Sequence, residues 1–354
     1  MLIHNPSLHF PFSEAPEPLS LMEVAPGVFW LRIKLPFKLD HINVYLIEDV
    51  VGWTLVDSGL GDPAGRDAWN FLLAGPLSNI SITRLIVTHH HPDHVGAAGW
   101  LSRQLNAPLY MGETEYHIAQ SILLSPSSLD TEDNRRFYLD HGLDAGVTSE
   151  VVALGREYQE IVTALPPTFC PLIPDDTIQI GRRNFLILSG AGHSVEQLML
   201  YCPTDGLFFA ADQVLAQISP NIGVWSAEPN GDPLSLYIRS LDDLKKRVSE
   251  GALILPGHGL PFYGLHKRIN ELMDHHRSRC AIIETACGDV PRSASELTKL
   301  LFPRVQDIHQ MRFAFSETLA HINAMVTSHR LQWVKGNGYP RKVVRLDPAK
   351  HGLT

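Results

Sequence analysis

The stretch Thr88-His89-His90-His91-Pro92-Asp93-His94 follows directly after the apolar run Leu85-Ile86-Val87. A short β-branched run that ends in polar residues predicts a buried strand followed by a loop. Imidazole and carboxylate groups are the ligands that suit zinc and neighbouring first-row metals. The stretch therefore predicts a metal-binding loop, and a complete site requires further ligands from elsewhere in the chain.

Four more apolar runs end in the same way, with Asp or His at the start of the following loop. A lone His after a strand is more often structural than a ligand, but five such positions on one sheet edge indicate a shared site. The additional positions are Asp57 after residues 53–56, His193 after residues 185–188, Asp212 after residues 207–211 and His258 after residues 252–255.

The position of Asp57 allows two interpretations. Its carboxylate can cap the helix expected near residues 66–73, because Asp is a favoured N-cap residue. It can also support the metal-binding loop from behind, because sheets of the α/β type place functional groups at strand ends. The two roles are compatible with each other.

Residues 113–165 have apolar residues at three- and four-residue spacing, which predicts helices near residues 114–124, 131–141 and 149–165. A helical insert between strands of a metal domain would form a cap over the site, and such caps usually set substrate choice. A stabilising flank is the alternative, and the spacing alone does not decide between them.

The length of 354 residues favours one large domain, residues 1–265, and a smaller one, residues 266–354. The hydrophobic fraction of 44% is ordinary for a soluble globular protein. The N-terminus lacks the pattern of a signal peptide, and no apolar run approaches the ~18 residues of a membrane span. The four scattered cysteines, Cys170, Cys202, Cys280 and Cys287, indicate reduced thiols and a cytoplasmic protein.

Basic residues are concentrated near the C-terminus. Residues 291–346 hold nine Lys/Arg and three Asp/Glu, a net of +6, whereas residues 1–290 hold 19 Lys/Arg and 34 Asp/Glu, a net of −15. Such asymmetry can mark an interaction tail, although a domain interface or a solvated face is the favoured interpretation. Helices expected at residues 266–285, 293–302 and 311–327 precede two short strands, residues 330–335 and 341–346, around a tight turn. This order predicts a winged-helix-like region.

The pattern His89-x-His91-x-Asp93-His94, with Asp57 upstream and His193, Asp212 and His258 downstream, resembles the metallo-β-lactamase superfamily. The resemblance spans residues 57–258 and implies a four-layer αββα sandwich with a metal pair at one edge. The basic tail is similar to the winged-helix region of one branch of that superfamily. The resemblance implies that His89, His91 and His193 bind the first metal and that Asp93, His94 and His258 bind the second. It also implies that Asp212 bridges both metals and that Asp57 holds the ligand loop from behind.

Three positions refine this expectation. His90 lies between two of the ligands in an extended loop, so we expect it to point away from the metals. The lactamase branch proper commonly uses Cys where this chain has Asp212, which argues against antibiotic hydrolysis. Diiron flavoprotein relatives place Glu at the position of His91, which argues for a hydrolytic site here, although persulfide dioxygenase relatives also retain His there.

We therefore expect a dinuclear-metal hydrolase in which a metal-bridging hydroxide attacks a small ester, thioester or lactone. Asp93 would accept or relay a proton. Zinc is the expected metal, and Mn²⁺ or Fe²⁺ would also fit a His/Asp site. The negative charge of the metal domain disfavours a polyanionic substrate there.

Two alternatives belong to other classes. An endoribonuclease-type phosphodiesterase would use the basic C-terminal domain to hold RNA. A regulator without catalysis would require a vestigial metal site, which the complete ligand set opposes. The substrate, the native metal and the oligomeric state stay open at this point.

Overall fold

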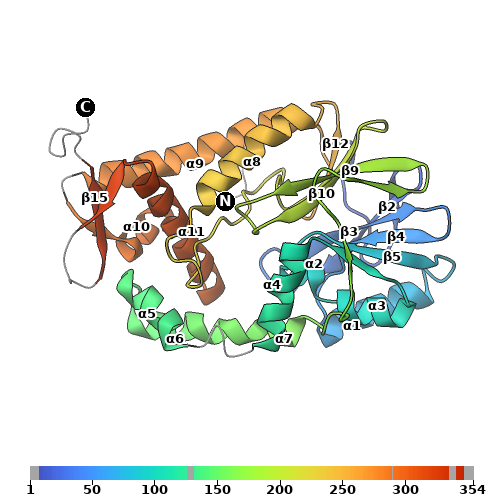
Figure 1. Ribbon diagram of the computed structural model, residues 1–354, viewed down its shortest axis with the longest axis horizontal. Coiled ribbons are helices and arrows are strands. Elements are labelled where there is room, and N and C mark those ends of the chain that lie inside the picture. The colour runs from blue at the N-terminus through green and yellow to red at the C-terminus, as the bar shows by residue number, and fades with distance from the viewer. Residues whose placement is uncertain (1–7, 126–130, 289, 335–339, 347–354) are drawn as a thin grey trace. The chain divides into compact units, whose positions relative to one another are not determined.

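The computed structural model describes residues 8–125, 131–288, 290–334 and 340–346 (Figure 1). The chain divides into two compact units. Unit 1 contains Met1–Ser125, Glu157–Pro220 and Ser240–Ile269, and unit 2 contains Pro126–Arg156, Asn221–Arg239 and Asn270–Thr354. This interleaved division differs from the two consecutive segments, residues 1–265 and 266–354, that we expected from the sequence.

Within its described residues, unit 1 is built on two β-sheets (Figure 1). The first sheet has the order β1-β2-β3-β4-β5-β6-β7 and the second has the order β12-β11-β10-β9-β8. The strands of the first sheet are β1 (Met22–Ala25), β2 (Val28–Lys34), β3 (His41–Glu48), β4 (Trp53–Val56), β5 (Ile82–Val87), β6 (Leu109–Met111) and β7 (Cys170–Pro171). Those of the second are β8 (Thr177–Ile180), β9 (Arg183–Gly190), β10 (Gln197–Cys202), β11 (Leu207–Ala211) and β12 (Leu253–Pro256).

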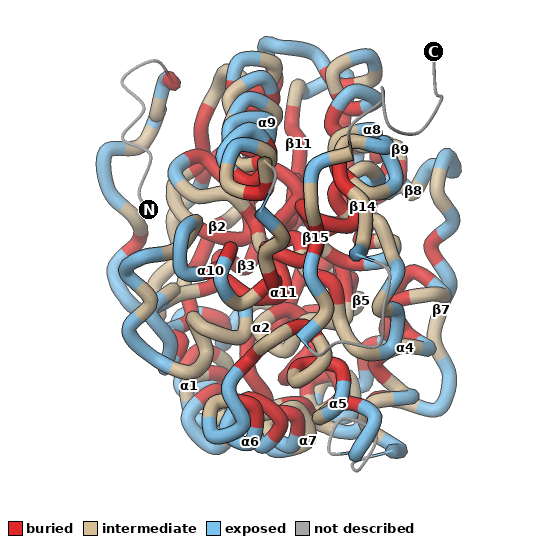
Figure 2. Tube along the Cα trace, turned by 90° about the vertical axis from the view of Figure 1, so that its left-hand side faces the viewer, coloured by how far each residue is buried: buried red, intermediate tan, exposed pale blue. Residues whose placement is uncertain are grey.

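Side chains alternate along the strands, so the two faces of the first sheet bury different sets. Along β2, Val28 and Trp30 enter the core between the two sheets, whereas Leu31 and Ile33 enter a core on the opposite face. Figure 2 shows the strands largely as buried residues. The core on the opposite face includes side chains from α1 (Pro63–Ala74), α3 (Ala98–Leu105) and α4 (Glu113–Leu124). This order of a helix layer and two packed sheets agrees with the αββα sandwich that the sequence resemblance implies.

Strand direction explains why the predicted site residues meet. β4 and β5 are parallel, and β11 and β12 are parallel. β9 and β11 are each antiparallel to β10, so β9, β11 and β12 all run in the same direction. The carboxyl ends of strands that run in the same direction lie at one edge of their sheet. The loops after β4 and β5 therefore leave the first sheet at one edge, and the loops after β9, β11 and β12 leave the second sheet at one edge.

The helical insert is divided between the two units. α4 and α7 (Glu157–Ile161) belong to unit 1, whereas α5 (Glu132–Asp140) and α6 (Ala145–Ala153) belong to unit 2. The single helix expected over residues 149–165 is wrong, since a 3₁₀ turn at Leu154–Arg156 separates α6 from α7. Gly155 lies in that turn, and glycine is among the residues least favourable in a helix interior.

The described residues of unit 2 also contain a small sheet with the order β13-β15-β14. Its strands are β13 (Arg292–Ser293), β14 (Leu331–Trp333) and β15 (Lys342–Arg345), and residues 335–339 of the expected turn lie outside the described residues. Its helices include α10 (Ala294–Leu301), α11 (Ile308–Thr327) and most of α9 (Leu265–Cys287). We did not predict α8 (Pro233–Arg247), which begins in unit 2 and ends in unit 1.

No helix in the described part of the chain is long and apolar enough to cross a membrane. Cys170, Cys202, Cys280 and Cys287 are free thiols, as the sequence predicted.

Candidate metal centre

Three imidazole nitrogens converge where the loop after β5 meets the loop after β9. His89 Nε2 lies 3.0 Å from His91 Nδ1, which lies 2.9 Å from His193 Nε2. A proton on His91 Nδ1 can form a good hydrogen bond with only one of these two neighbouring nitrogens. The spacing does suit nitrogen ligands of one ion, because Zn–N bonds of about 2.0–2.1 Å place neighbouring ligand atoms about 3 Å apart.

A second group forms around the loop that follows β12. His258 Nε2 lies 3.2 Å from Asp93 Oδ2, and His94 Nε2 lies 3.7 Å from the same oxygen. The other nitrogen of each ring is already engaged, since His258 Nδ1 donates to the backbone oxygen of His41 at 2.7 Å and His94 Nδ1 donates to Asp57 at 2.8 Å. Both Nε2 atoms are therefore left to face the centre.

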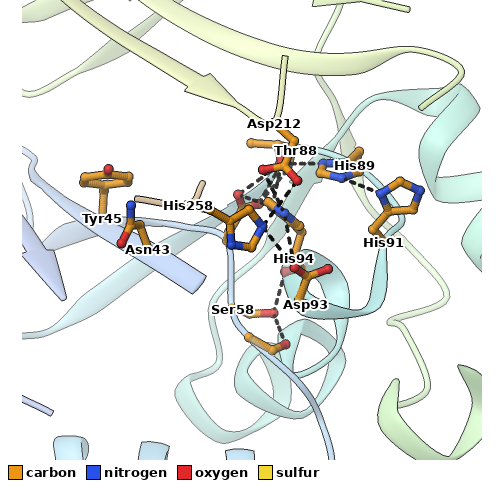
Figure 3. Close-up of polar contacts among 12 residues, drawn as sticks. Asn43, Tyr45, Ser58, Thr88, His89, His91, Asp93, His94, Asp212 and His258 are labelled. Carbon is orange, nitrogen blue, oxygen red and sulfur yellow. Dashed lines mark hydrogen bonds and ion pairs between the residues drawn. The ribbon is translucent and has the colours of Figure 1, made fainter. Parts of the chain in front are cut away.

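Asp212, directly after β11, connects the two groups (Figure 3). Its Oδ2 lies 3.4 Å from His193 Nε2 and 3.3 Å from His258 Nε2, and its Oδ1 lies 3.4 Å from His94 Nε2. The structure thus brings together all of the residues that the sequence predicted as ligands. They are His89, His91, Asp93, His94, His193, Asp212 and His258.

Two buried atoms between the two groups indicate whether these residues fit a metal ion. His94 Nε2 and Asp212 Oδ1 are buried, and neither has a hydrogen-bond partner among the described residues. Leaving such a group unsatisfied costs about 1–3 kcal/mol each, and more for a charged group. One cation beside both atoms would satisfy them, and nitrogen and carboxylate oxygen are ligands that Zn²⁺ accepts.

The imidazole rings of the centre differ in protonation. Burial lowers the pKa of His89 well below its usual value, and the adjacent His94 and His91 lower it further, so this ring is neutral at pH 7. Burial raises the pKa of Asp212, but His258 and His94 outweigh burial and hold it well below its usual range. Burial lowers the pKa of His94 and of His258, but Asp212 and the neighbouring carboxylates outweigh burial and raise the pKa of His94 well above its usual value and that of His258 to about 10. Neutral imidazole and ionised carboxylate are the forms that bind metals. A metal ion would therefore displace a proton from each of these two rings.

The contacts of Asp57 show which of its two interpretations holds. Its side chain accepts hydrogen bonds from Thr88 N at 2.9 Å and from His94 Nδ1 at 2.8 Å. The N-cap of α1 is Asp62, whose side chain accepts from Gly65 N, so the expectation that Asp57 caps this helix is wrong. Asp57 adopts a φ of +62°, a strained conformation of the kind that clusters at functional sites.

Comparisons with known proteins agree with this geometry. Residues 38–258 match the model of the metallo-β-lactamase superfamily, which is more than half of the chain. This chain belongs to the metallo-β-lactamase superfamily. Residues 280–344 match the model of the metallo-β-lactamase-like C-terminal domain.

Three similar proteins match most of the chain. A β-lactamase domain protein from Burkholderia ambifaria is 35% identical, with a TM-score of 0.86 over 96% of this chain and 97% of that one. A metallo-β-lactamase family protein from Thermus thermophilus is 29% identical, with a TM-score of 0.77 over 91% of this chain and 100% of that one. The probable metallo-hydrolase YqjP of Bacillus subtilis (strain 168) is 24% identical over 309 residues, covering 84% of this chain and 92% of that protein. The chain is accordingly a metallo-hydrolase of the metallo-β-lactamase superfamily.

The loop after β12 is held by buried side chains that the sequence did not single out. Asn43 Nδ2 and Tyr45 Oη, both on β3, donate to the backbone oxygen of Pro256 at 2.9 Å. Asn43 Nδ2 also lies 2.9 Å from the backbone oxygen of Gly259. These bonds fix the backbone on both sides of His258.

We expect Gly257→Ala to impair the metallo-β-lactamase centre. A Cβ on Gly257 would lie 2.3 Å from Asp212 Oδ1 and 2.9 Å from His94 Cε1, so one of these side chains must move. The expected result is a fall in metal content and in hydrolysis. Metal analysis of the purified variant checks it, and Gly251→Ala, where the nearest atom is 3.8 Å away, is the control. Full metal content in Gly257→Ala would show that Asp212 is not held as described.

A buried carboxylate that the sequence did not reveal lies behind the His89–His94 loop. As expected, the His90 ring is not among the converging groups, and its Nδ1 lies 2.5 Å from Glu115 Oε2. Tyr158 Oη donates to the backbone oxygen of His90 at 2.7 Å. Glu115 was missed because an acid in the first turn of a helix is most simply explained by the helix dipole.

Unit 2 contains a further buried group of potential ligands, His276, Glu317 and His321. His276 Nδ1 lies 3.1 Å from His321 Nε2, and His321 Nδ1 donates to the backbone oxygen of Glu317 at 2.7 Å. Arg279 forms an ion pair with Glu317. Because the guanidinium already neutralises this carboxylate and opposes a second cation, we interpret the group as a polar network within the helices.

Proposed function

We propose that the protein hydrolyses a small ester, thioester or lactone at a pair of divalent metal ions. The observation that carries this proposal is the position of Asp212, whose Oδ2 lies within 3.4 Å of His193 on one side and 3.3 Å of His258 on the other. One carboxylate that faces two ligand groups suits a site with two ions, since it offsets charge on both. Each group alone resembles an ordinary single-ion site.

In this proposal each residue keeps the role that the family resemblance implied. His89, His91 and His193 would hold the first ion, Asp93, His94 and His258 would hold the second, and Asp212 would serve both. Zinc fits this donor set, and Mn²⁺ or Fe²⁺ are the alternatives. Bound ions would supply an activated water and an electrophile for the carbonyl oxygen.

Proton transfer and orientation of the ligands would be carried out by side chains of the protein. Asp93 is the most exposed of the three carboxylates, with 20% of its side chain accessible, against 8% for Asp212 and 4% for Asp57. We assign Asp93 Oδ2 the transfer of a proton between the reacting group and solvent. Asp57 keeps the proton of His94 on Nδ1, which leaves Nε2 free to act as a ligand.

The charges around the centre support a neutral acyl substrate. The carboxylates of Asp57 and Glu115 are hydrogen-bonded to residues of the His89–His94 loop, and Glu196 follows His193 by three positions. Enzymes that hold phosphate groups usually use Lys or Arg. Two bound divalent ions would offset the carboxylates of the centre, so little excess positive charge would remain for a polyanion, whereas an uncharged ester or lactone requires none.

The competing endoribonuclease proposal depends on the basic C-terminal residues. Several of these are engaged inside unit 2, where Arg330 pairs with Glu284 at 2.6 Å and Arg292 lies 3.5 Å from Glu296. Arg341 stacks on Trp333 with its guanidinium carbon 4.3 Å from the ring centroid. These contacts support a structural role for the positive charge.

A substrate panel tests the proposal. We expect metal-dependent turnover of p-nitrophenyl esters, acyl thioesters or homoserine lactones, and no cleavage of single-stranded RNA. Each assay is run with the metal-loaded enzyme and with the same enzyme after chelation, so that background hydrolysis is subtracted. Metal-dependent RNA cleavage without turnover of any acyl compound would overturn the proposal, and a steep salt dependence of RNA binding would support the alternative.

A further inference from the structure

Glu115, in the first turn of α4, is fully buried and connects two loops of unit 1. Its Oε2 accepts from His90 N at 2.9 Å and lies 2.5 Å from His90 Nδ1. Its Oε1 accepts from Ser194 Oγ at 2.6 Å and from Glu196 N at 2.7 Å. Each oxygen of one carboxylate therefore serves a different loop.

These two loops carry the three-histidine group. His90 lies between His89 and His91, and Ser194 directly follows His193. The nitrogens of His91 and His193 are 2.9 Å apart across the gap between the loops. A group that fixes the separation of the loops thus fixes the separation of these ligand atoms. Asp57 does the corresponding work for His94, in the other group.

Only an ionised carboxylate satisfies the contacts of Glu115. Two backbone N–H groups, a hydroxyl and a ring nitrogen surround it, and these supply donors to both oxygens. Burial raises the pKa of Glu115, but the hydrogen bonds and charge of His90 and the hydrogen bonds of Ser194 and Glu196 lower it to about 2. A glutamine has the same shape, but its NH₂ group would face hydrogen-bond donors of one of the two loops. That loop would lose its hydrogen bonds to the side chain at position 115.

We propose that Glu115 is a positioning residue that sets the metal affinity of the three-histidine site without setting that of the Asp93–His94–His258 site. This inference rests on the proposed two-metal function. It assigns α4, the first helix of the predicted insert, a part in metal binding. Outer partners of this kind typically change metal affinity by about 10–100-fold when replaced.

The test compares Glu115→Gln with Glu113→Gln. Glu113 lies on the same helix, and its side chain is 75% exposed, so the control makes the same chemical change without touching either loop. Zinc is titrated into each metal-depleted protein, and the affinity of each equivalent is measured by competition with a chromophoric chelator. Anomalous scattering from zinc-soaked crystals then assigns each equivalent to one of the two positions.

We expect Glu115→Gln to weaken zinc at the three-histidine position by about 10–100-fold, with little change at the other position. Glu113→Gln should match the unmodified protein at both positions. If Glu115→Gln does not fold, Ser194→Ala removes one donor to Oε1 and should give a smaller weakening at the same position.

Two outcomes overturn this inference. Equal affinities in Glu115→Gln and the unmodified protein would do so, as would an equal loss at both positions. The number of zinc ions bound by the unmodified protein tests the proposed function separately. Fewer than two ions would contradict the dinuclear proposal. Site-selective weakening of a single bound ion would still support the role of Glu115.

Discussion

Asp212→Ala is expected to lose metal and hydrolytic activity together. The side chain is 8% exposed and faces His94, His193 and His258, so no neighbouring water layer can replace it easily. Loss of groups that merely orient a ligand costs about 10–100-fold in metal affinity, and removal of the residue that we propose as a ligand to both ions should exceed this. Elemental analysis after dialysis and kcat/KM on the best substrate of the panel measure the two losses.

Asp212→Asn separates the charge of this residue from its shape. The amide keeps the volume and one acceptor oxygen, so this variant should fold and should retain more metal than Asp212→Ala. Far-UV circular dichroism confirms that any loss is local. Two metal ions per chain in Asp212→Ala would show that the ligand assignment is wrong.

Removal of metal by a chelator is expected to lower the thermal stability of unit 1. Asp57, Asp93 and Asp212 lie around the same centre, and the divalent charge that offsets them would be gone. At a free-metal concentration about 100 times Kd, each occupied site adds about 2.7 kcal/mol to the free energy of unfolding. At about 2–4 °C per kcal/mol, the unfolding midpoint should fall by roughly 5–10 °C for each site emptied.

Scanning calorimetry with and without chelator measures this shift. Added zinc should restore the midpoint, whereas added Mg²⁺, which prefers oxygen ligands, should not. Asp212→Ala is the control, and its midpoint should respond weakly to the chelator. An unmodified protein whose midpoint ignores both chelator and zinc would contradict a metal centre built from these residues.

The positions of the proposed ligand residues were predictable because they follow strands with a clear apolar pattern. Leu85-Ile86-Val87 before the histidines and Leu253-Ile254-Leu255 before His258 both form buried strands, β5 and β12. Parallel directions within each sheet then place the loops at one edge. Local sequence and one topological rule were sufficient for this part of the site.

The supporting residues were not predictable, because their partners are distant in the chain. Glu115 contacts residues 25 and 79 positions away, and Asn43 contacts Pro256, which is 213 positions away. Nothing in the apolar periodicity of α4 or β3 marks these side chains. The same limit applies to the insert, where helical spacing indicated helices but did not assign α5 and α6 to unit 2.

The division of the chain into units bears on how the protein can be dissected. The chain passes from one unit to the other after residues 125, 156, 220, 239 and 269, and the last two of these positions lie inside α8 and α9. A gene fragment that stops at residue 265 would encode segments 126–156 and 221–239 without most of unit 2. It would also end at the first residue of α9. Unit 1, which contains the candidate metal centre, is therefore not encoded by one continuous segment, and engineering of this protein has to keep the segments of both units together.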